Sequence, residues 1–245
     1  MKYNFDEVID RSGTNSVKWD QESLKHLFGE SDAIPFWVAD MDFKSAQPII
    51  DEIVKRAEHG IYGYSVRPDS YFEAIINWIK RRHGWTIEKE WIEYTPGVVP
   101  AINYLIQAFC EPGDKTLIFN DDHYEIDFED FEKKSRDPKV KMFILCSPHN
   151  PIGRVWTKEE LIRLGDICLK NNVIVVADEI HNDLVFSGYK HIMFGSIRED
   201  FRMNSITCTA PSKTFNLAGM EISNIIIPNP EYRRKYKKVL DKNSI

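Results

Sequence analysis

The sequence predicts an α/β protein built on a mostly parallel, mixed sheet with helices on both faces. Short runs of β-branched and other apolar residues recur along the chain, and VIVVA (173–177) is the clearest of them. Longer segments with apolar residues at helical spacing separate these runs. Strands buried on both faces and separated by amphipathic helices are typical of parallel sheets. The 245 residues, 42% of them apolar, are enough to bury a sizeable core.

The N-terminal part of the chain contains an irregular arm and two predicted helices. Residues 1–35 are polar and rich in turn formers. The first helix is expected over residues 48–60, where the apolar residues at helical spacing are Ile50, Ile53, Val54 and Ala57. The second helix is expected to begin at Ser70, with Glu73 completing a capping box, and to end at Gly84.

From residue 91 onward, predicted strands and helices alternate. The expected strands are WIEYT (91–95), TLIF (116–119), MFILC (142–146), VIVVA (173–177), SITCT (205–209) and NIII (224–227). One helix follows Gly97, and another begins at a capping box formed by Thr157 and Glu160. Ligands of such sheets bind at the carboxyl ends of the strands. The polar residues that directly follow the strands are therefore the candidate functional residues.

The composition argues against several classes of function. The net charge of −6 is spread along the chain without a basic stripe, so binding to nucleic acid is not expected. No apolar run reaches the length of a membrane span, and the first residues, MKYNFDEVID, do not have the pattern of a signal peptide. The four cysteines show no CxxC spacing, which favours reduced thiols in a cytoplasmic protein over disulfides or a metal site.

An acidic residue and a basic residue each follow a predicted central strand. Asp178 comes directly after VIVVA, with His181 three residues later. The carboxylate can cap a turn, act as a general base or partner a cationic ring nitrogen. Lys213 follows SITCT in the segment TAPSKTFNLAG, where hydroxyl groups flank it. It can form an imine with a carbonyl compound, or it can be an ordinary solvated loop lysine.

Two further segments place hydrogen-bond donors at the same edge. In MFILCSPHNPIGRVW, two prolines bracket Asn150 in a turn, so its amide is held where it can donate to an anionic oxygen. In TPGVVPAI, Gly97 precedes a helix whose first N–H groups are free to bind an anion. Each segment also has an ordinary explanation, as a strand-terminating turn or as a helix that begins after glycine.

Together, and in this order, the four segments resemble the fold-type I enzymes that depend on pyridoxal 5′-phosphate (PLP), the class I/II aminotransferase superfamily. Two more segments, IPFWVADMDF (34–43) and YGYSVRPDSY (62–71), resemble its C–S lyase branch, which includes cystalysin-like and cystathionine β-lyase-like enzymes. The resemblance runs from about Phe5 to Pro228. It implies the fold of a PLP-transferase large domain.

The resemblance implies a role for each residue around the cofactor ring. Lys213 would carry PLP covalently and would then take the Cα proton of the substrate. Asp178 would pair with the pyridinium nitrogen and keep it protonated. Asn150 would donate to the phenolic oxygen of the ring, and His181 would lie where many aminotransferases place a tyrosine near that oxygen.

The resemblance also implies residues for the phosphate, the substrate and a second subunit. The phosphate would be held by backbone donors and a hydroxyl group, which belong to Gly97, Val98, Val99 and Ser212. Tyr64 would reach the phosphate of the neighbouring subunit, so a homodimer is expected. Trp37 and Ala39 would lie at the substrate end of the site.

Two departures from the family pattern concern the length of the chain. Family members have additional residues after residue 119, and they continue beyond NIII into a smaller C-terminal domain with the arginine that binds the substrate carboxylate. The sequence therefore suggests an N-terminal arm or cap (1–45), a PLP-binding large domain (46–230) and the start of a truncated interdomain helix (231–245), with the C-terminal small domain missing.

The function implied by the resemblance is PLP-dependent β-elimination on a sulfur amino acid. A cysteine S-conjugate or cystathionine would give a thiol, pyruvate and ammonia. An aminotransferase on the same scaffold is an alternative, since both reactions begin with removal of the Cα proton. A third alternative is a non-catalytic relic that binds PLP or a partner chain.

Overall fold

The computed structural model describes residues 3–119 and 125–245. Contacts divide the chain into two units, and each is described by itself. The smaller unit consists of Met1–Gly63 with Phe215–Gly219, and the larger unit consists of Tyr64–Thr214 with Met220–Ile245. The division at residues 45 and 230 suggested by the sequence remains a prediction.

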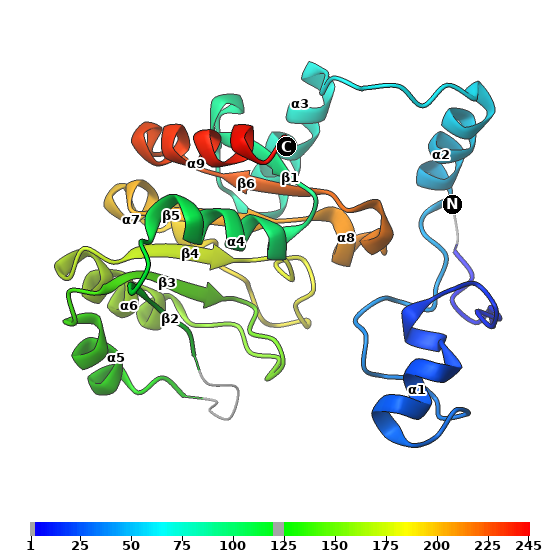
Figure 1. The fold of residues 1–245 in the computed structure, drawn as a ribbon, viewed down its shortest axis with the longest axis horizontal. Helices are drawn as coiled ribbons and strands as arrows, with labels where there is room; N and C mark the ends of the chain where they lie inside the picture. Colours follow the sequence, from blue (N-terminus) through cyan, green and yellow to red (C-terminus); the bar gives the residue numbers. More distant parts are fainter. Residues whose placement is uncertain (1–2, 120–124) are drawn as a thin grey trace. The chain divides into compact units, whose positions relative to one another are not determined.

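Within the described residues, the larger unit contains a six-stranded mixed sheet with the strand order β1-β6-β5-β4-β3-β2 (Figure 1). The strands are β1 (Ile92–Thr95), β2 (Lys115–Leu117), β3 (Val140–Cys146), β4 (Ile174–Asp178), β5 (Ser205–Thr209) and β6 (Ser223–Ile226). Strands β2 to β5 run parallel, whereas β6 runs antiparallel to both of its neighbours. The predicted mostly parallel sheet is confirmed, and every expected strand is present.

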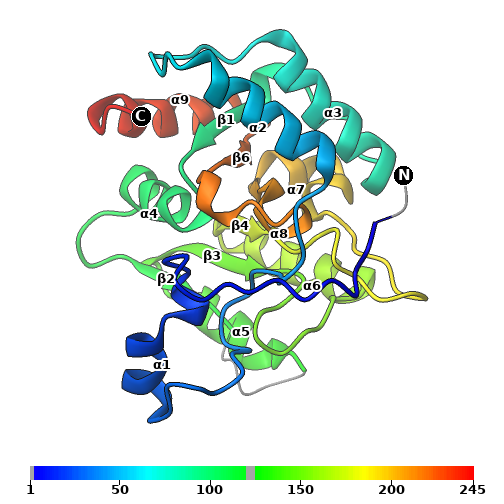
Figure 2. The ribbon, with the colours of Figure 1, turned by 90° about the vertical axis from the view of Figure 1, so that its right-hand side faces the viewer.

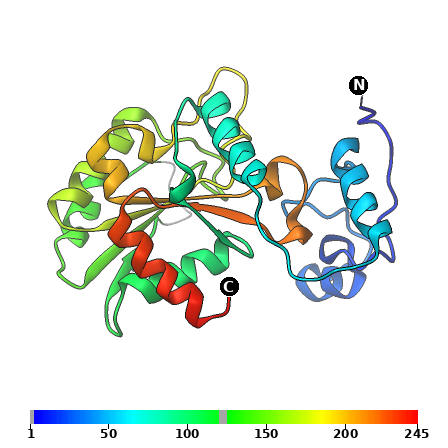
Figure 3. The same cartoon turned by 90° about the horizontal axis from the view of Figure 1, so that it is seen from above.

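Helices cover both faces of this sheet, as predicted. They are α3 (Asp69–His83), α4 (Val98–Phe109), α5 (Phe128–Ser135), α6 (Lys158–Lys170), α7 (Glu199–Met203), α8 (Pro211–Thr214) and α9 (Pro230–Lys242). On one face α5, α6 and α7 pack against the sheet, in a cluster that includes Phe131, Phe143, Leu164 and Phe201. On the other face lie α4 and α9, with Leu105, Val176, Ile225 and Tyr236 (Figure 3).

The two predicted capping boxes have different outcomes. The box of Thr157 and Glu160 is present at the start of α6. The box predicted at Ser70 is wrong, because α3 begins at Asp69 and its N-cap is Pro68 in an extended conformation. The fixed φ of proline prepares the entry into the helix, and the carboxylate of Asp69 in the first turn complements the helix dipole.

The smaller unit contains η1 (Val17–Trp19), α1 (Gln21–Phe28) and α2 (Gln47–His59). A buried lysine, Lys18, donates to the Asp42 carboxylate over 2.7 Å and to the Asp40 carbonyl over 2.8 Å. Burial alone would raise the pKa of Asp42, but hydrogen bonds from Lys18, Trp19 and Arg11 lower it to about 2. This cluster fixes the segment that contains Trp37 and Ala39.

Asn216 holds the end of the same segment. Its amide donates to the carbonyl of Phe43 over 2.9 Å and to that of Met41 over 3.0 Å, and its Oδ1 accepts from the Met41 N–H. The residues just after Lys213 are thereby anchored in the smaller unit.

In the described chain, α2 buries none of its residues. None of the described helices is long and apolar enough to cross a membrane.

The contact between α6 and α7 leaves no room for a side chain at Gly165. A Cβ atom added there would lie 2.3 Å from Cζ of Phe201, whose ring stacks on Phe194. We expect Gly165→Ala to destabilise the chain by about 1–3 kcal/mol, because the buried rings must shift. Urea unfolding measures the loss. Gly219→Ala, where a Cβ meets no atom within 4 Å, is the control, and equal midpoints for the two variants would contradict the packing.

Candidate active site

Four parallel strands end at one edge of the sheet, and the candidate residues follow them. The register pairs Asp178, the last residue of β4, with Cys146 of β3 on one side and with Cys208 of β5 on the other. In Figure 1 the arrows of β3 and β4 point towards this edge, and Figure 2 views the sheet from it. The topology therefore brings together the segments that follow β3, β4 and β5.

Asp178 is a largely buried carboxyl group without a charged hydrogen-bond partner. Its Oδ1 accepts a single N–H, that of Ile180, over 3.3 Å in the described part of the chain. Burial is the main reason that the pKa of Asp178 rises to about 6, and the neighbouring charge of Glu179 adds to the rise. The hydrogen bond from Ile180 and the charge of Lys213 oppose it.

Lys213 lies within electrostatic reach of Asp178 and of His181. It is carried by α8, which begins two residues after β5. Burial lowers the pKa of His181, and the positive charge of Lys213 lowers it further, so the imidazole is mainly neutral at pH 7. The same amine also lowers the pKa of Asp178, so its charge acts on both side chains.

Asn150 lies in the turn that follows β3. Its backbone N–H donates to Sγ of Cys146 over 3.4 Å, and the turn closes through the hydrogen bond from the His149 N–H to the Arg154 carbonyl over 2.7 Å. The residue itself is exposed. The loop therefore holds the backbone of Asn150 at the carboxyl end of the strand next to β4.

The first turn of α4 offers two backbone donors. The hydroxyl of Thr95 donates to the Gly97 carbonyl over 3.1 Å, and that of Ser223 donates to the Thr95 carbonyl over 2.9 Å. The Gly97 N–H donates to the Thr95 carbonyl over 2.8 Å, and its predicted role as a phosphate donor remains a prediction. The N–H groups of Val98 and Val99 remain as first-turn donors.

The other predicted residues lie at separate places. Ser212 precedes Lys213 in α8 and is half-buried. Tyr64 is fully exposed at the start of the larger unit. Trp37 and Ala39 belong to the smaller unit, where the Trp37 indole donates to the Lys18 carbonyl over 3.2 Å. The predicted roles of these residues at the substrate and the phosphate remain predictions.

Asp183, five residues after Asp178, is a further buried acidic residue that the sequence motifs did not predict. Its carboxylate is buried and accepts hydrogen bonds from side chains of α3 and α8. The available signal was a carboxylate directly before three apolar residues in the run HNDLVF, because an unpartnered acid is costly to bury.

Comparison with known proteins decides the family. Residues 119–244 match the family described as aminotransferase class I and II. The cystathionine beta-lyase PatB of Bacillus subtilis (strain 168) is 44% identical over 99% of this chain and 68% of its own length. The chain belongs to the class I and II aminotransferase family.

Two solved structures of this family contain PLP. Cystalysin from Treponema denticola is 38% identical with a TM-score of 0.92, and the match covers 100% of this chain and 68% of that one. The PLP-bound C–S lyase from Staphylococcus hominis is 36% identical with a TM-score of 0.89, over 98% and 67% of the two chains. This chain therefore spans about two thirds of the length of these relatives, and it has the fold of a PLP-transferase large domain.

The titration of Asp178 predicts a pH-dependent stability of the cofactor-free chain. Because folding raises this pKa from 3.8 to about 6, the folded state is favoured while the carboxyl is protonated and loses that advantage as pH rises through 6. Asp178→Asn should therefore be more stable than the natural chain at pH 7.5, by up to about 3 kcal/mol, with no difference below pH 4.

Urea unfolding between pH 4 and pH 8 measures this difference. Asp241→Asn, at an exposed position of α9, is the matched control and should show no such trend. A stability difference for Asp178→Asn that does not change with pH would contradict the burial of an unpaired carboxylate.

Proposed function

We propose that this chain is the cofactor-binding part of a PLP-dependent carbon–sulfur lyase that performs β-elimination on a sulfur amino acid. A cysteine S-conjugate or cystathionine would give a thiol, pyruvate and ammonia. The observation that carries the proposal is the largely buried Asp178 carboxylate, which has no charged hydrogen-bond partner among residues 3–119 and 125–245 and lies within electrostatic reach of the Lys213 amine.

The residues present fit PLP. A carboxyl with a raised pKa and a single backbone donor has a strong preference for a cationic partner, and a pyridinium nitrogen is such a partner. The first-turn N–H groups of Val98 and Val99 suit a phosphate group. When bound, PLP supplies a conjugated cationic ring that takes up the electron pair left when the substrate's Cα–H bond breaks.

The residues of the chain would bind, orient and move a proton. The amine of Lys213 would hold the cofactor at rest and then accept the Cα proton of the substrate. Asp178 would stay ionised against the ring nitrogen. The amide of Asn150 would donate to the phenolic oxygen of the cofactor, near which the neutral imidazole of His181 would lie.

The rest of the predicted site completes the proposal. Ser212 would add a hydroxyl donor to the phosphate, and Tyr64 would reach the phosphate of a second subunit in a cytoplasmic homodimer. Trp37 and Ala39 would line the substrate end. The smaller unit supports this last role, since the cluster around Asp42 and the clamp of Asn216 hold their segment in a fixed conformation.

The names of the relatives favour the lyase over an aminotransferase. The B. subtilis relative is a cystathionine beta-lyase, and the S. hominis structure is a C–S lyase. The family description favours an aminotransferase as the second candidate. Both reactions start with the same proton transfer to Lys213, so the product distinguishes them.

The proposed attachment of PLP to Lys213 can be tested by absorption spectroscopy. PLP added to the purified chain should give a visible absorption band, and borohydride reduction should trap the cofactor on the peptide that contains Lys213. Lys213→Ala should lose the band and lower pyruvate release by at least about 100-fold, because both the attachment point and the base are gone. Lys190→Ala, at an exposed loop position, is the control. An unchanged band in Lys213→Ala would refute the assignment.

The second prediction separates the reactions. Pyruvate and ammonia should form from cystathionine without any keto acid. Turnover that requires a keto-acid acceptor would identify an aminotransferase instead. A band at Lys213 with neither product would identify a chain that binds PLP without catalysis.

A further inference from the structure

A buried carboxylate with four donors lies beside the lysine-bearing helix. Oδ2 of Asp183 accepts from the indole of Trp78 over 2.9 Å and from the hydroxyl of Thr214 over 3.0 Å. Oδ1 accepts from Nε2 of His83 over 3.1 Å and from Nε of Arg82 over 3.3 Å. The Asp183 side chain is only 5% exposed. Each carboxylate oxygen thus accepts from two donors, which satisfies the hydrogen-bonding capacity of a buried carboxylate.

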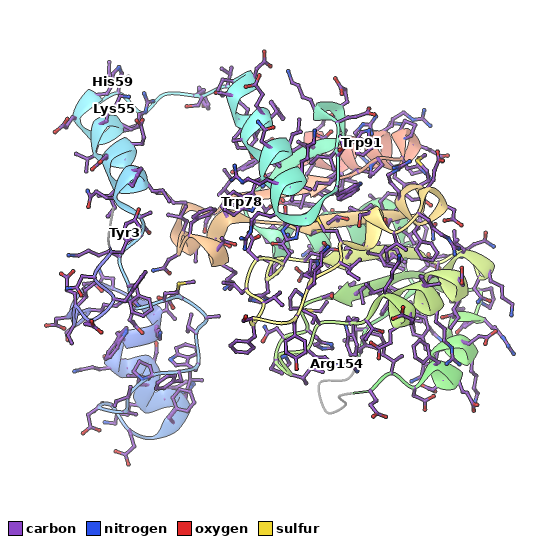
Figure 4. All side chains as sticks on the ribbon, turned by 180° about the vertical axis from the view of Figure 1, so that it is seen from behind. Tyr3, Lys55, His59, Trp78, Trp91 and Arg154 are labelled. Atoms are coloured by element: carbon purple, nitrogen blue, oxygen red, sulfur yellow. The ribbon has the colours of Figure 1, made fainter. Side chains whose placement is uncertain are left out.

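The four donors belong to two helices of very different length, α3 and α8. Trp78, labelled in Figure 4, and His83 belong to α3. This helix packs through Ile79 into a buried apolar cluster with Ile92 and Ile226. Thr214 belongs to α8, which has four residues and buries none of them. A helix this short is not stable by itself, so its position depends on contacts with the rest of the unit. The hydrogen bond from Thr214 to Asp183 is such a contact.

Asp183 is held in its charged form. Burial would raise its pKa, but the hydrogen bonds from His83, Trp78 and Thr214 outweigh burial and lower the pKa to about 2. At neutral pH the acceptor is therefore a full anion, and hydrogen bonds to an anion are about twice as strong as neutral ones. An ionised anchor next to α8 contrasts with Asp178, whose pKa is raised to about 6.

The same network reaches the residue next to Asp178. The ring of His83 packs edge-on against that of His191, with 5.8 Å between centroids. Nε2 of His191 lies 3.0 Å from the carboxylate of Glu179, which also accepts from the Phe194 N–H over 2.8 Å. These side chains are buried. A continuous set of contacts thus joins Thr214, which follows Lys213, to Glu179, which follows Asp178.

We infer that Asp183 is a positioning residue that holds Thr214, and through it Lys213, at a fixed place relative to Asp178. Asp183 touches neither substrate nor cofactor in this role. It fixes the backbone of α8 against the rigid α3, so that the amine of Lys213 need not be ordered at each encounter with a ligand. The inference rests on the proposed function, because it concerns the proposed role of Lys213 in holding PLP and accepting the Cα proton.

Two substitutions at one position test the anchor. Thr214→Val removes the hydroxyl and keeps the shape of the side chain, whereas Thr214→Ser keeps the hydroxyl. In the full chain without PLP, amide hydrogen exchange of Ser212, Lys213 and Thr214, the residues of α8 that have an N–H, should be at least about tenfold faster in Thr214→Val. Exchange in Thr214→Ser should stay within about twofold of the natural chain, and exchange in β4 and β5 should not change in either variant.

Attachment of PLP provides the second readout. The rate at which the visible band grows after PLP is added should fall at least about fivefold in Thr214→Val and in Asp183→Asn, and Thr214→Ser should restore it. Ser135→Ala is the control, since it removes another buried hydroxyl, which donates to the Phe131 carbonyl over 2.7 Å on α5. It should leave both readouts unchanged.

The outcomes separate the anchor from the proposed function. Thr214→Val with normal exchange at α8 would overturn the positioning role, and so would accelerated exchange throughout the larger unit in both Thr214 variants. A natural chain that takes up no PLP would refute the proposed function instead. The exchange measurement would still decide whether Asp183 holds α8, because it needs no cofactor.

Discussion

A carboxyl group at the end of the central strand β4 is the constraint on which the site depends. Strands β3 and β5 flank Asp178 at the same level, so water reaches its carboxylate poorly and its pKa rises to about 6. The sheet imposes this environment through its topology, because parallel strands end side by side. The same topology delivers Lys213 and Asn150 to that edge, each a few residues beyond a neighbouring strand.

Asp178 and Asp183 lie five residues apart in the sequence, and the fold shifts their pKa values in opposite directions. Four side-chain donors hydrogen-bond to Asp183, which stays ionised down to about pH 2. Asp183 can therefore have a structural role. Asp178 accepts one backbone N–H from the part of the chain that the structure describes, and it has no cationic hydrogen-bond partner there. A site that binds a cationic ring requires a carboxylate with few other donors, such as Asp178. A short helix that is held in place requires a carboxylate that is fully hydrogen-bonded, such as Asp183.

The sequence predicted the strands well because runs such as VIVVA are buried on both faces and carry no polar residue. It predicted the juxtaposition of Asp178 and Lys213 by resemblance, since no spacing along the chain encodes it. The start of α3 was wrong because Pro68 fixed the entry one residue earlier than the Ser70 box. Asp183 was missed because its partners, Trp78 and Thr214, lie on elements more than a hundred residues and thirty residues away.

The titration of Asp178 itself tests the central claim most directly. In chain labelled with carbon-13 at aspartate carboxyl groups, with Asp178→Asn to assign the signal, the carboxyl should titrate near pH 6 without cofactor. With PLP bound it should remain ionised down to at least about pH 4, because a cationic ring nitrogen then opposes protonation. A midpoint near the ordinary value in both states, with no change on adding PLP, would contradict the account.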